Sequence, residues 1–219
     1  MALRARYNGQ LETLHLQLIK MGALSEDAID SAMKSLFNHD SSMAEKTFSI
    51  EKDIDEQEKD IENLCIKLLL EQQPVASDLR MVSSAMRMIS DLERIGDLAE
   101  NIAEVTRFIN NDDVVSRLPL KAISDTATEM VAESVESFVR RDAELAQKVI
   151  DSDDTVDEYF IEIKKALMEE IKADSDNGEA CLDLLMVSKY LERVADHAVN
   201  VGEWVIYAVT GEHPANKEQ

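Results

Sequence analysis

The sequence has few of the residues that interrupt helices or cross-link small folds. Among its 219 residues there are three prolines, six glycines and two cysteines, and aromatic residues make up 5%. So few prolines and glycines favour long helices. The low aromatic content argues against a β-sandwich or barrel. Hydrophobic residues nevertheless reach 45%, which is enough for a packed core and argues against disorder.

An excess of basic residues is also missing. The chain has 23 lysines and arginines against 45 aspartates and glutamates, so its formal net charge is −22. Direct binding to nucleic acid or to an anionic lipid surface would meet electrostatic repulsion, and we expect neither. The charge instead suits cations, basic protein partners, or solubility alone.

Long apolar runs, targeting segments and paired cysteines are absent as well. The longest uninterrupted apolar run, residues 204–209, is too short to span a bilayer, and the first residues lack the apolar core of a signal peptide. Cys65 and Cys181 have neither metal-site nor redox spacing, so we predict two free buried thiols in a reducing compartment. We therefore expect a soluble, cytoplasmic protein.

Catalytic motifs are equally scarce. The sequence has no glycine-rich phosphate loop and no nucleophile elbow. Only Glu12 and His15 form a Glu-x-x-His motif, whereas a ferritin-like di-iron bundle needs two. These absences argue against an enzyme.

The sequence does contain an internal repeat. Residues 91–102 return as residues 190–201, and seven of the thirteen positions 92–104 are identical in the second copy at an offset of 99. Unrelated segments would share about one residue in thirteen, so the match indicates two copies of one structural unit. The identical positions are Leu92, Glu93, Arg94, Asp97, Ala99, Asn101 and Glu104.

Apolar residues at helical spacing predict three helices in each copy. The first helix is expected to run through Gly22, because the apolar stripe keeps its phase there, and Asp40 is expected to cap the second helix. The predicted helices span about residues 7–37, 41–71, 77–110, 119–140, 143–172 and 178–211. The chain is thus predicted to be all-α, with two tandem three-helix bundles at residues 1–111 and 112–219.

Acidic residues four positions apart recur at equivalent places in the two copies. Residues at this spacing share one face of a helix, so neighbouring antiparallel helices are expected to bring two pairs together in each half. The pairs are Glu51/Asp55 and Glu93/Asp97 in the first half, and Asp153/Asp157 and Glu192/Asp196 in the second. The offset is 102 for the pairs on the second helices and 99 for those on the third. This drop predicts a connection that is three residues shorter in the second half.

Two interpretations of these acids remain open. Like charges at this spacing destabilise an isolated helix by a few tenths of a kcal/mol, so a solvated face tolerates them or bound cations offset them. Carboxylates suit Mg, Mn, Ca or iron, and Asn101 or Asn200 would add an oxygen ligand. Alternatively, Arg94 and Arg193 neutralise the acids in surface ion pairs. His197 is expected to be a surface or interface histidine rather than a ligand.

Three segments together resemble the PhoU family of phosphate-uptake regulators, and the resemblance covers nearly the whole chain. The first segment is residues 6–11, with Met21 and Gly22 further along the same helix. The second is residues 73–80, which read Gln-Pro-Val-Ala-Ser-Asp-Leu-Arg. The third is residues 91–97, followed by Asn101 and Ile102, and it resembles the most characteristic motif of the family.

The resemblance implies two symmetric bundles that hold multinuclear clusters of divalent or trivalent metal ions, such as Fe, Mn or Mg. The eight paired acids would be the ligands. It also implies a non-enzymatic adaptor between the ATPase subunit of a Pst-type phosphate ABC transporter and a phosphate-sensing histidine kinase. Such an adaptor would repress phosphate uptake and the phosphate-starvation response. We expect a cytoplasmic homodimer, recruited to the inner face of the membrane by protein partners and not by lipid.

A second class of function is a metal-storage or metal-sensing bundle whose partners are incidental. A metal-dependent hydrolase is less favoured, because no general base is present beyond the carboxylates that would bind the metal. The second copy departs from the family pattern, since Ala195 and His197 replace Gly96 and Leu98, and both acids of its second helix are aspartates. Its metal site is therefore expected to be weaker or differently populated.

Overall fold

The chain folds into long antiparallel helices. The computed structural model describes residues 2–72 and 76–214, with side chains for residues 6–70 and 76–214. No strand occurs among the described residues. The elements are α1 (Ala2–Asn38), α2 (Ser41–Gln72), α3 (Ala76–Thr106), α4 (Asp112–Arg117), α5 (Leu120–Arg140), α6 (Ala143–Ala173), the 3-10 turn η1 (Ser175–Asn177) and α7 (Gly178–Thr210). The predicted all-α class and the six long helices are confirmed.

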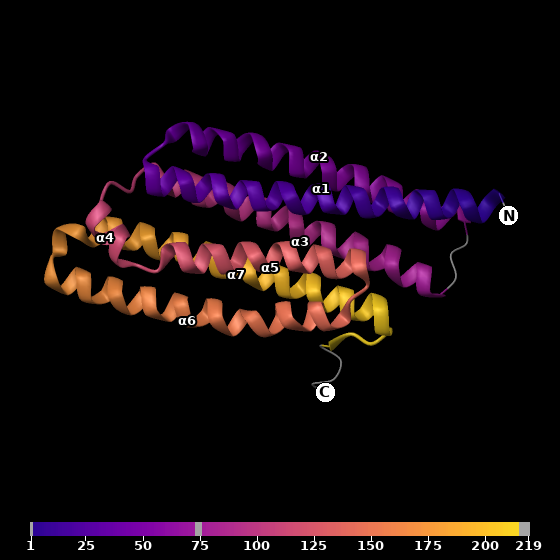
Figure 1. Cartoon of the computed structure of the whole chain (residues 1–219). Coiled ribbons are helices and arrows are strands. Elements are labelled where there is room, and N and C mark those ends of the chain that lie inside the picture. Colours follow the sequence, from indigo (N-terminus) through magenta and orange to yellow (C-terminus); the bar gives the residue numbers. More distant parts are fainter. Residues whose placement is uncertain (1, 73–75, 215–219) are drawn as a thin grey trace.

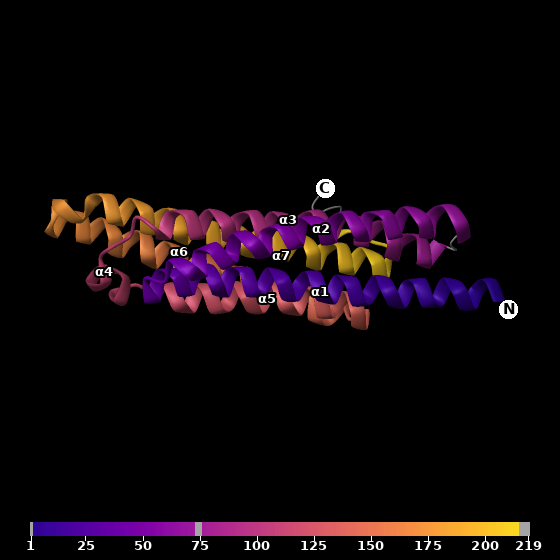
Figure 2. The same ribbon diagram turned by 90° about the horizontal axis from the view of Figure 1, so that it is seen from above.

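Each half is a three-helix bundle, and the two bundles lie side by side. Helices α1, α2 and α3 pack together in the first half, and α5, α6 and α7 in the second. Between the halves, α3 packs along α7 and α1 along α5. The helices α2 and α6 therefore lie at the two outer edges (Figure 1). Seen from above, α1 and α5 share one side of the molecule, opposite α2 and α3 (Figure 2).

The two bundles share one continuous hydrophobic core. The central helix α3 buries fourteen residues and α7 buries twelve, whereas the outer helix α6 buries five. The third helix of each half is thus covered on two sides, by its own bundle and by the other half. On the opposite side of the molecule, Gly22 permits a close approach of α1 to α5, because a Cβ there would lie 3.0 Å from Val135 Cγ2.

The ends of the first helices repeat in detail. His39 and Arg141, at the same offset of 102, both take up left-handed backbone conformations with φ of 51° and 55°. The next residue caps the following helix in each half. Asp40 accepts a hydrogen bond from the Ser42 backbone N–H at 2.9 Å, and Asp142 accepts from the N–H groups of Glu144 and Leu145. These bonds satisfy amides that lack helical partners. The cap predicted at Asp40 is confirmed.

One helix boundary is predicted wrongly. The third helix ends at Thr106 and not near residue 110, because Ile109 turns into the core at 1% exposure. The polar stretch around residue 112 then forms the short helix α4, whose first turn is capped by the Asn111 side chain accepting from the Val114 N–H at 3.2 Å. The 111/112 boundary lies at this cap, and the division of the chain into residues 1–111 and 112–219 stays a prediction.

The three-residue deletion does not fall in the connection. Glu93 lies 17 residues after the first residue of α3, whereas Glu192 lies 14 residues after the first residue of α7. The second copy has therefore lost most of a helical turn from the start of its third helix. Residues 73–75, which belong to the segment 73–80 quoted above, lie outside the described residues.

A polar contact joins the halves where α3 meets α7. Asp91 Oδ1 of α3 lies 2.8 Å from His197 Nδ1 of α7 and accepts a hydrogen bond from Asn200 Nδ2 at 3.1 Å. Both Asp91 and His197 are largely withdrawn from solvent. His197 is thus an interface histidine, as predicted. The equivalent positions of the other copy, Tyr190 and Leu98, form no such pair.

The structure also bears on the predictions about membrane-spanning segments and cysteines. Within the part that the structure describes, no helix has the length and apolar character needed to cross a membrane. Cys65 and Cys181 are buried free thiols, as predicted. Burial, helped by the nearby charge of Glu62, raises the pKa of the Cys65 thiol to about 12, so this residue remains an inert core thiol.

Candidate metal centre

The four acids predicted in the first half gather between α2 and α3. We call Glu51, Asp55, Glu93 and Asp97 the first acidic cluster. Burial raises the pKa of Glu51, and the charges of Glu100, Asp55 and Asp97 raise it further. Burial also raises the pKa of Glu93, with a further contribution from Asp97. Carboxylates on the two helices therefore repel one another, as expected for acids crowded on adjoining faces.

Two further acids, which the repeat did not predict, lie beside this cluster. Glu58 of α2 and Glu100 of α3 also have raised pKa values, chiefly through burial, and the charge of Asp55 or Asp97 adds to the effect. Ser90 Oγ donates a weak hydrogen bond to Glu58 Oε1 at 3.4 Å. The sequence does contain a signal for them, because Glu58 lies three residues after Asp55 and Glu100 three residues after Asp97. Their repeat equivalents are Phe160 and Val199, so a search for repeated acids could not find them.

The four acids of the second half gather in the same way between α6 and α7. Asp153, Asp157, Glu192 and Asp196 form the second acidic cluster. Burial and then the charges of Asp196, Asp157 and Glu192 raise the pKa of Asp153 to about 6. All eight predicted residues thus lie in two groups of four, one in each half.

Both clusters lie on the same broad side of the molecule. Each lies between the second and third helices of its bundle, on the side away from the first helix. The first helices, α1 and α5, lie together on one side of the molecule (Figure 2), so the two clusters are both on the other side. The adjoining third helices, α3 and α7, separate the clusters.

Basic side chains already pair with some of these acids. Arg94 Nη1 lies 2.7 Å from Asp97 Oδ2, and its Nε lies 3.4 Å from Glu93 Oε2. Of the two arginine ion pairs in the alternative interpretation, that of Arg94 is therefore present. In the second half no ion pair of Arg193 is found among the described residues, and Lys189 pairs with Glu192 instead. Arg94 and Lys189 are partly exposed, so these pairs add little stability.

The donor set suits a hard cation, although the carboxylates would have to move to bind one. Among the described residues, no three acidic, histidine or cysteine side chains already converge on a metal position. The Asp153 Oδ1 atom, however, is buried without a hydrogen-bond partner. A buried carboxylate oxygen without a donor is costly unless a cation or proton satisfies it. The two asparagines point elsewhere, since Asn101 donates to the Asp97 backbone carbonyl and Asn200 to Asp91.

Comparison with known proteins identifies the fold. The family model described as the PhoU domain matches residues 18–106 and again residues 120–205. The chain belongs to the PhoU family. The two matches confirm the internal repeat and the resemblance of the motifs, and the residues between them include the predicted 111/112 boundary.

Relatives and a solved structure agree with this assignment. An Aquifex aeolicus protein named as a phosphate-specific transport system accessory protein PhoU homolog is 40% identical, over 93% of this chain and 92% of its own length. A protein of the same name from Clostridium acetobutylicum is 34% identical, over 95% and 96%. The crystal structure of PhoU from Pseudomonas aeruginosa superposes with a TM-score of 0.87 at 32% identity, covering 94% of this chain and all of that one.

Proposed function

We propose that this PhoU-family protein is a non-enzymatic adaptor that represses phosphate uptake and the phosphate-starvation response. It would link the ATPase subunit of a phosphate ABC transporter to a phosphate-sensing histidine kinase at the inner face of the membrane. The names of its relatives, accessory proteins of phosphate-specific transport, support the first part of this proposal. The sequence has no glycine-rich phosphate loop and no nucleophile elbow to support catalysis.

The observation that carries the proposal is the pair of acidic clusters on one side of the molecule. Burial and then repulsion between the carboxylates raise the pKa of Asp153 and Glu51, and without cations that repulsion would oppose the approach of another acidic protein surface. Divalent or trivalent ions such as Fe, Mn or Mg, held by the eight clustered carboxylates, would cancel that repulsion. Metal binding would therefore permit docking, and loss of metal would release the partner.

The proposal is tested with purified proteins. Binding of the full chain to the transporter ATPase subunit and to the cytoplasmic part of the kinase is measured by calorimetry, with added Mn²⁺ or Mg²⁺ and with chelator. We expect binding with metal and its loss with chelator. Unchanged affinity for both partners in chelator would contradict the metal-dependent switch.

A matched pair of variants separates the two clusters. Asp153→Asn with Asp157→Asn removes two ligands from the second cluster, and Glu51→Gln with Asp55→Asn does the same in the first. Each pair is expected to lower the number of bound ions, and the change is measured by elemental analysis. Many tightly retained ions per chain, with no binding to either partner, would instead favour metal storage or sensing.

We also propose that the protein is a homodimer in solution. A chain of net charge −22 needs an interface that keeps its acidic clusters apart, so the dimer contact would lie away from them. Light scattering on the metal-free protein gives the mass directly. A monomer at all concentrations would contradict the dimer and would leave the adaptor role untouched.

A further inference from the structure

The surface where α3 adjoins α7 carries a row of arginines. Arg80, Arg87 and Arg94 follow one another at intervals of seven residues, so they share one stripe of α3. Arg193 of α7 is the repeat equivalent of Arg94. We call these four residues the arginine seam. Because Arg94 pairs with acids of the first acidic cluster, the stripe lies on the side of the molecule that carries both clusters.

Three contacts show that the stripe runs along α7. The Arg80 guanidinium packs against Gly211 at the end of α7, where a Cβ would lie 3.6 Å from it. Arg87 Cζ lies 5.8 Å from the centre of the Trp204 ring, and Asp91 bonds to α7 as described above. Residue numbers therefore rise along α3 as they fall along α7, so the two helices are antiparallel. The arginines thus lie where the two halves meet, between the two acidic clusters.

Three of the four arginines keep a charge that no acid neutralises. Arg80, Arg87 and Arg193 form no ion pair with any described residue, whereas Arg117, for example, pairs with Glu170 at 3.1 Å. A ring and a backbone turn hold Arg87 and Arg80, and such contacts leave the charge of a guanidinium available to a carboxylate. The Arg80 Nε atom is buried and lacks a hydrogen-bond acceptor. Uncompensated positive charge thus gathers on a chain of net charge −22.

The opposite end of the seam shows that the fold does not require this charge. The repeat equivalents of Arg80 and Arg87 are Glu179 and Met186 of α7. Both are exposed, as Arg87 is, and they occupy the corresponding surface of the other half. The basic residues therefore extend to one end only, where α3 begins and α7 ends. Packing does not explain why they are arginines.

One acid lies on the arginine stripe itself, and it is already bonded. Asp91 is largely withdrawn from solvent and contacts His197 and Asn200. Glu203 of α7 lies seven residues after Asp196, so it shares the stripe of the second acidic cluster, on the side toward α6. None of these acids is placed to neutralise the seam.

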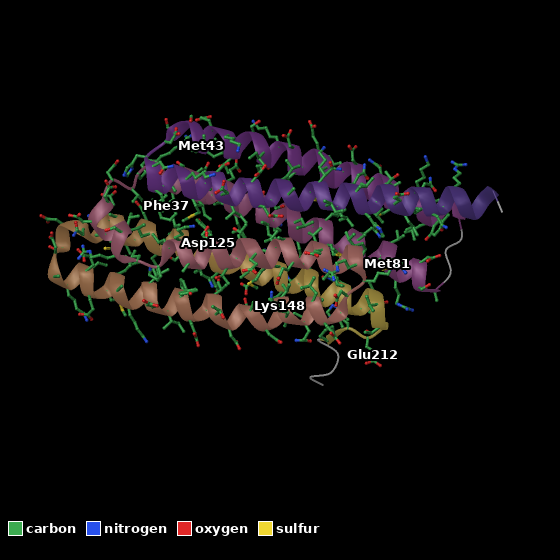
Figure 3. All side chains as sticks on the ribbon, viewed as in Figure 1. Phe37, Met43, Met81, Asp125, Lys148 and Glu212 are labelled. Carbon is green, nitrogen blue, oxygen red and sulfur yellow. The ribbon has the colours of Figure 1, made fainter. Side chains whose placement is uncertain are left out.

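The acids that flank the seam belong mainly to the two clusters. In the proposed function they bind metal ions and lose their negative charge. The face would then present cations on both flanks and free arginines between them. Glu212, labelled in Figure 3, lies beyond the end of α7, on the side away from α3. The metal-loaded face would therefore attract negative charge.

The spacing of the arginines indicates an extended acidic ligand. Two helical turns separate successive arginines of the stripe, so Arg80 and Arg87 are about 10 Å apart along the axis, and Arg94 is about 10 Å further. One small anion cannot reach all three, whereas a protein segment with several aspartates or glutamates can, through bidentate pairs with guanidinium groups.

Other occupants fit this surface less well. A nucleic acid would extend its closely spaced phosphates beyond the seam, over a chain of net charge −22. A second copy docked on the same face would set arginine against arginine and cluster against cluster. A basic or apolar segment would leave the guanidinium groups unpaired. Charge complementarity thus favours an acidic segment of a different protein.

We propose that the arginine seam docks an acidic segment of a partner protein along α3 and α7. Carboxylates of that segment would pair with Arg87 and Arg193, and the end of the segment would reach Arg80. This inference rests on the proposed adaptor function and names the charge of the partner surface. It also gives metal a reason to control docking, because the flanking carboxylates would repel the segment until cations occupy them.

The test compares two double variants of the full chain that lose the same charge. Arg87→Gln with Arg193→Gln alters the seam, and Lys164→Gln with Lys165→Gln removes two exposed lysines of α6 that form no ion pair with a described residue. Affinity for the transporter ATPase subunit and for the kinase is measured with Mn²⁺, as in the adaptor experiment. We expect the seam variant to bind one partner at least about tenfold more weakly and the control less than about twofold. Equal affinities for the two variants would overturn the inference.

Salt provides a second readout that a purely structural role of the arginines would not move. Wild-type binding of that partner should weaken as NaCl rises from 0.05 to 0.5 M, and the seam variant should respond less. The same salt dependence in both proteins would overturn the inference. Helical content, thermal stability and bound metal are checked for each variant. If the glutamine pair does not fold or loses metal, Arg87→Gln alone is compared with Lys164→Gln, and a difference below about twofold overturns the inference.

A photo-crosslinking residue at Ser83, between Arg80 and Arg87, identifies the occupant. A crosslink to a segment of the partner rich in aspartate and glutamate supports the proposal. A crosslink to a basic segment, to nucleic acid or to a second copy of this chain overturns it. If the wild-type chain binds neither partner with metal present, the adaptor function fails and this inference fails with it. Binding that the seam variant retains in full leaves the adaptor function intact and overturns this inference alone.

Discussion

Asp153 of α6 lies among the carboxylates of Asp157, Glu192 and Asp196 and is partly withdrawn from water. Burial and these charges raise its pKa from the ordinary 3.8 to about 6 in the native state. The native state therefore holds this proton more tightly than the unfolded chain between about pH 4 and pH 6. Ionisation of Asp153 thus lowers the stability of the fold as the pH rises through that window, and the loss persists at neutral pH.

Asp153→Asn should for this reason raise the free energy of unfolding of the metal-free protein at pH 7. The shift corresponds to about 3 kcal/mol, and because the site is partly solvated we expect a gain of about 1 kcal/mol. Urea unfolding in chelator measures it. Below about pH 4 the gain should disappear, since the carboxyl is then protonated in both states. A variant no more stable than wild type at pH 7 would show that solvent screens the cluster fully.

Asp91 illustrates a residue that belongs to the interface between the halves. Asp91→Ala removes the partner of both His197 and Asn200, which are only partly exposed. Groups left unpaired in such positions cost about 1–3 kcal/mol, and we expect a loss of stability in that range. Asp60→Ala on exposed α2 is the matched control, with a change within about 0.5 kcal/mol. Equal effects of the two changes would mean that the Asp91 contact is not stabilising.

At the scale of the helices, periodicity and capping chemistry predicted most of what the structure contains. The stripe that keeps its phase through Gly22 and the cap at Asp40 both rest on local rules that tertiary packing did not override. The short helix α4 was missed because six residues are too few for a periodic pattern, although Asn111 offered a capping signal. The end of α3 was misplaced because the burial of Ile109 depends on contacts distant in sequence.

Substitution of glycines within the helices tests how closely those helices pack. A Cβ at Gly202 of α7 would lie 3.1 Å from the Ala146 backbone oxygen of α6, whereas a Cβ at Gly9 of α1 would meet no atom within 4 Å. Gly9→Ala should raise the free energy of unfolding by up to about 1 kcal/mol through helix propensity. Gly202→Ala should lower it by about 1 kcal/mol, because a helix backbone cannot move aside cheaply. Thermal unfolding of both variants measures these changes in stability. A stabilised Gly202→Ala protein would mean that α6 yields at this crossing.

For the whole molecule, the sequence predicted two bundles, and it also predicted eight acids that the structure gathers in two groups. It did not predict that the bundles share a core. A helical stripe shows which residues are buried but not which neighbour covers them. The broad buried surface of α3 was the sign in the sequence that a second bundle covers this helix. The outer helices α2 and α6 pack only within their own bundles and have no such surface. Lys148 of the outer helix α6, labelled in Figure 3, pairs with Glu133 of α5, so this contact lies within the second bundle and does not join the halves.

The shared core predicts that the two halves unfold together. Trp204, the only tryptophan, lies on α7 with the guanidinium of Arg87 from α3 5.8 Å from its ring centre, so its fluorescence reports the interface. Urea unfolding followed by this fluorescence and by far-ultraviolet circular dichroism should give coincident transitions. Residues 112–219 expressed alone should show no cooperative transition, because α5 and α7 would expose apolar faces. Two separated transitions in the full chain would contradict a common core.

The packing of α3 along α7 has a consequence for the origin of the protein. A half-length ancestor with one such third helix would have left its apolar side in water, so it had to pair with a copy of itself about a two-fold axis. Every contact across that axis then occurred twice. Any substitution changed both copies at once, so each residue had to suit its place in both. Duplication and fusion ended this constraint. Asp91 and His197 could then differ from Tyr190 and Leu98, their equivalents in the other copy.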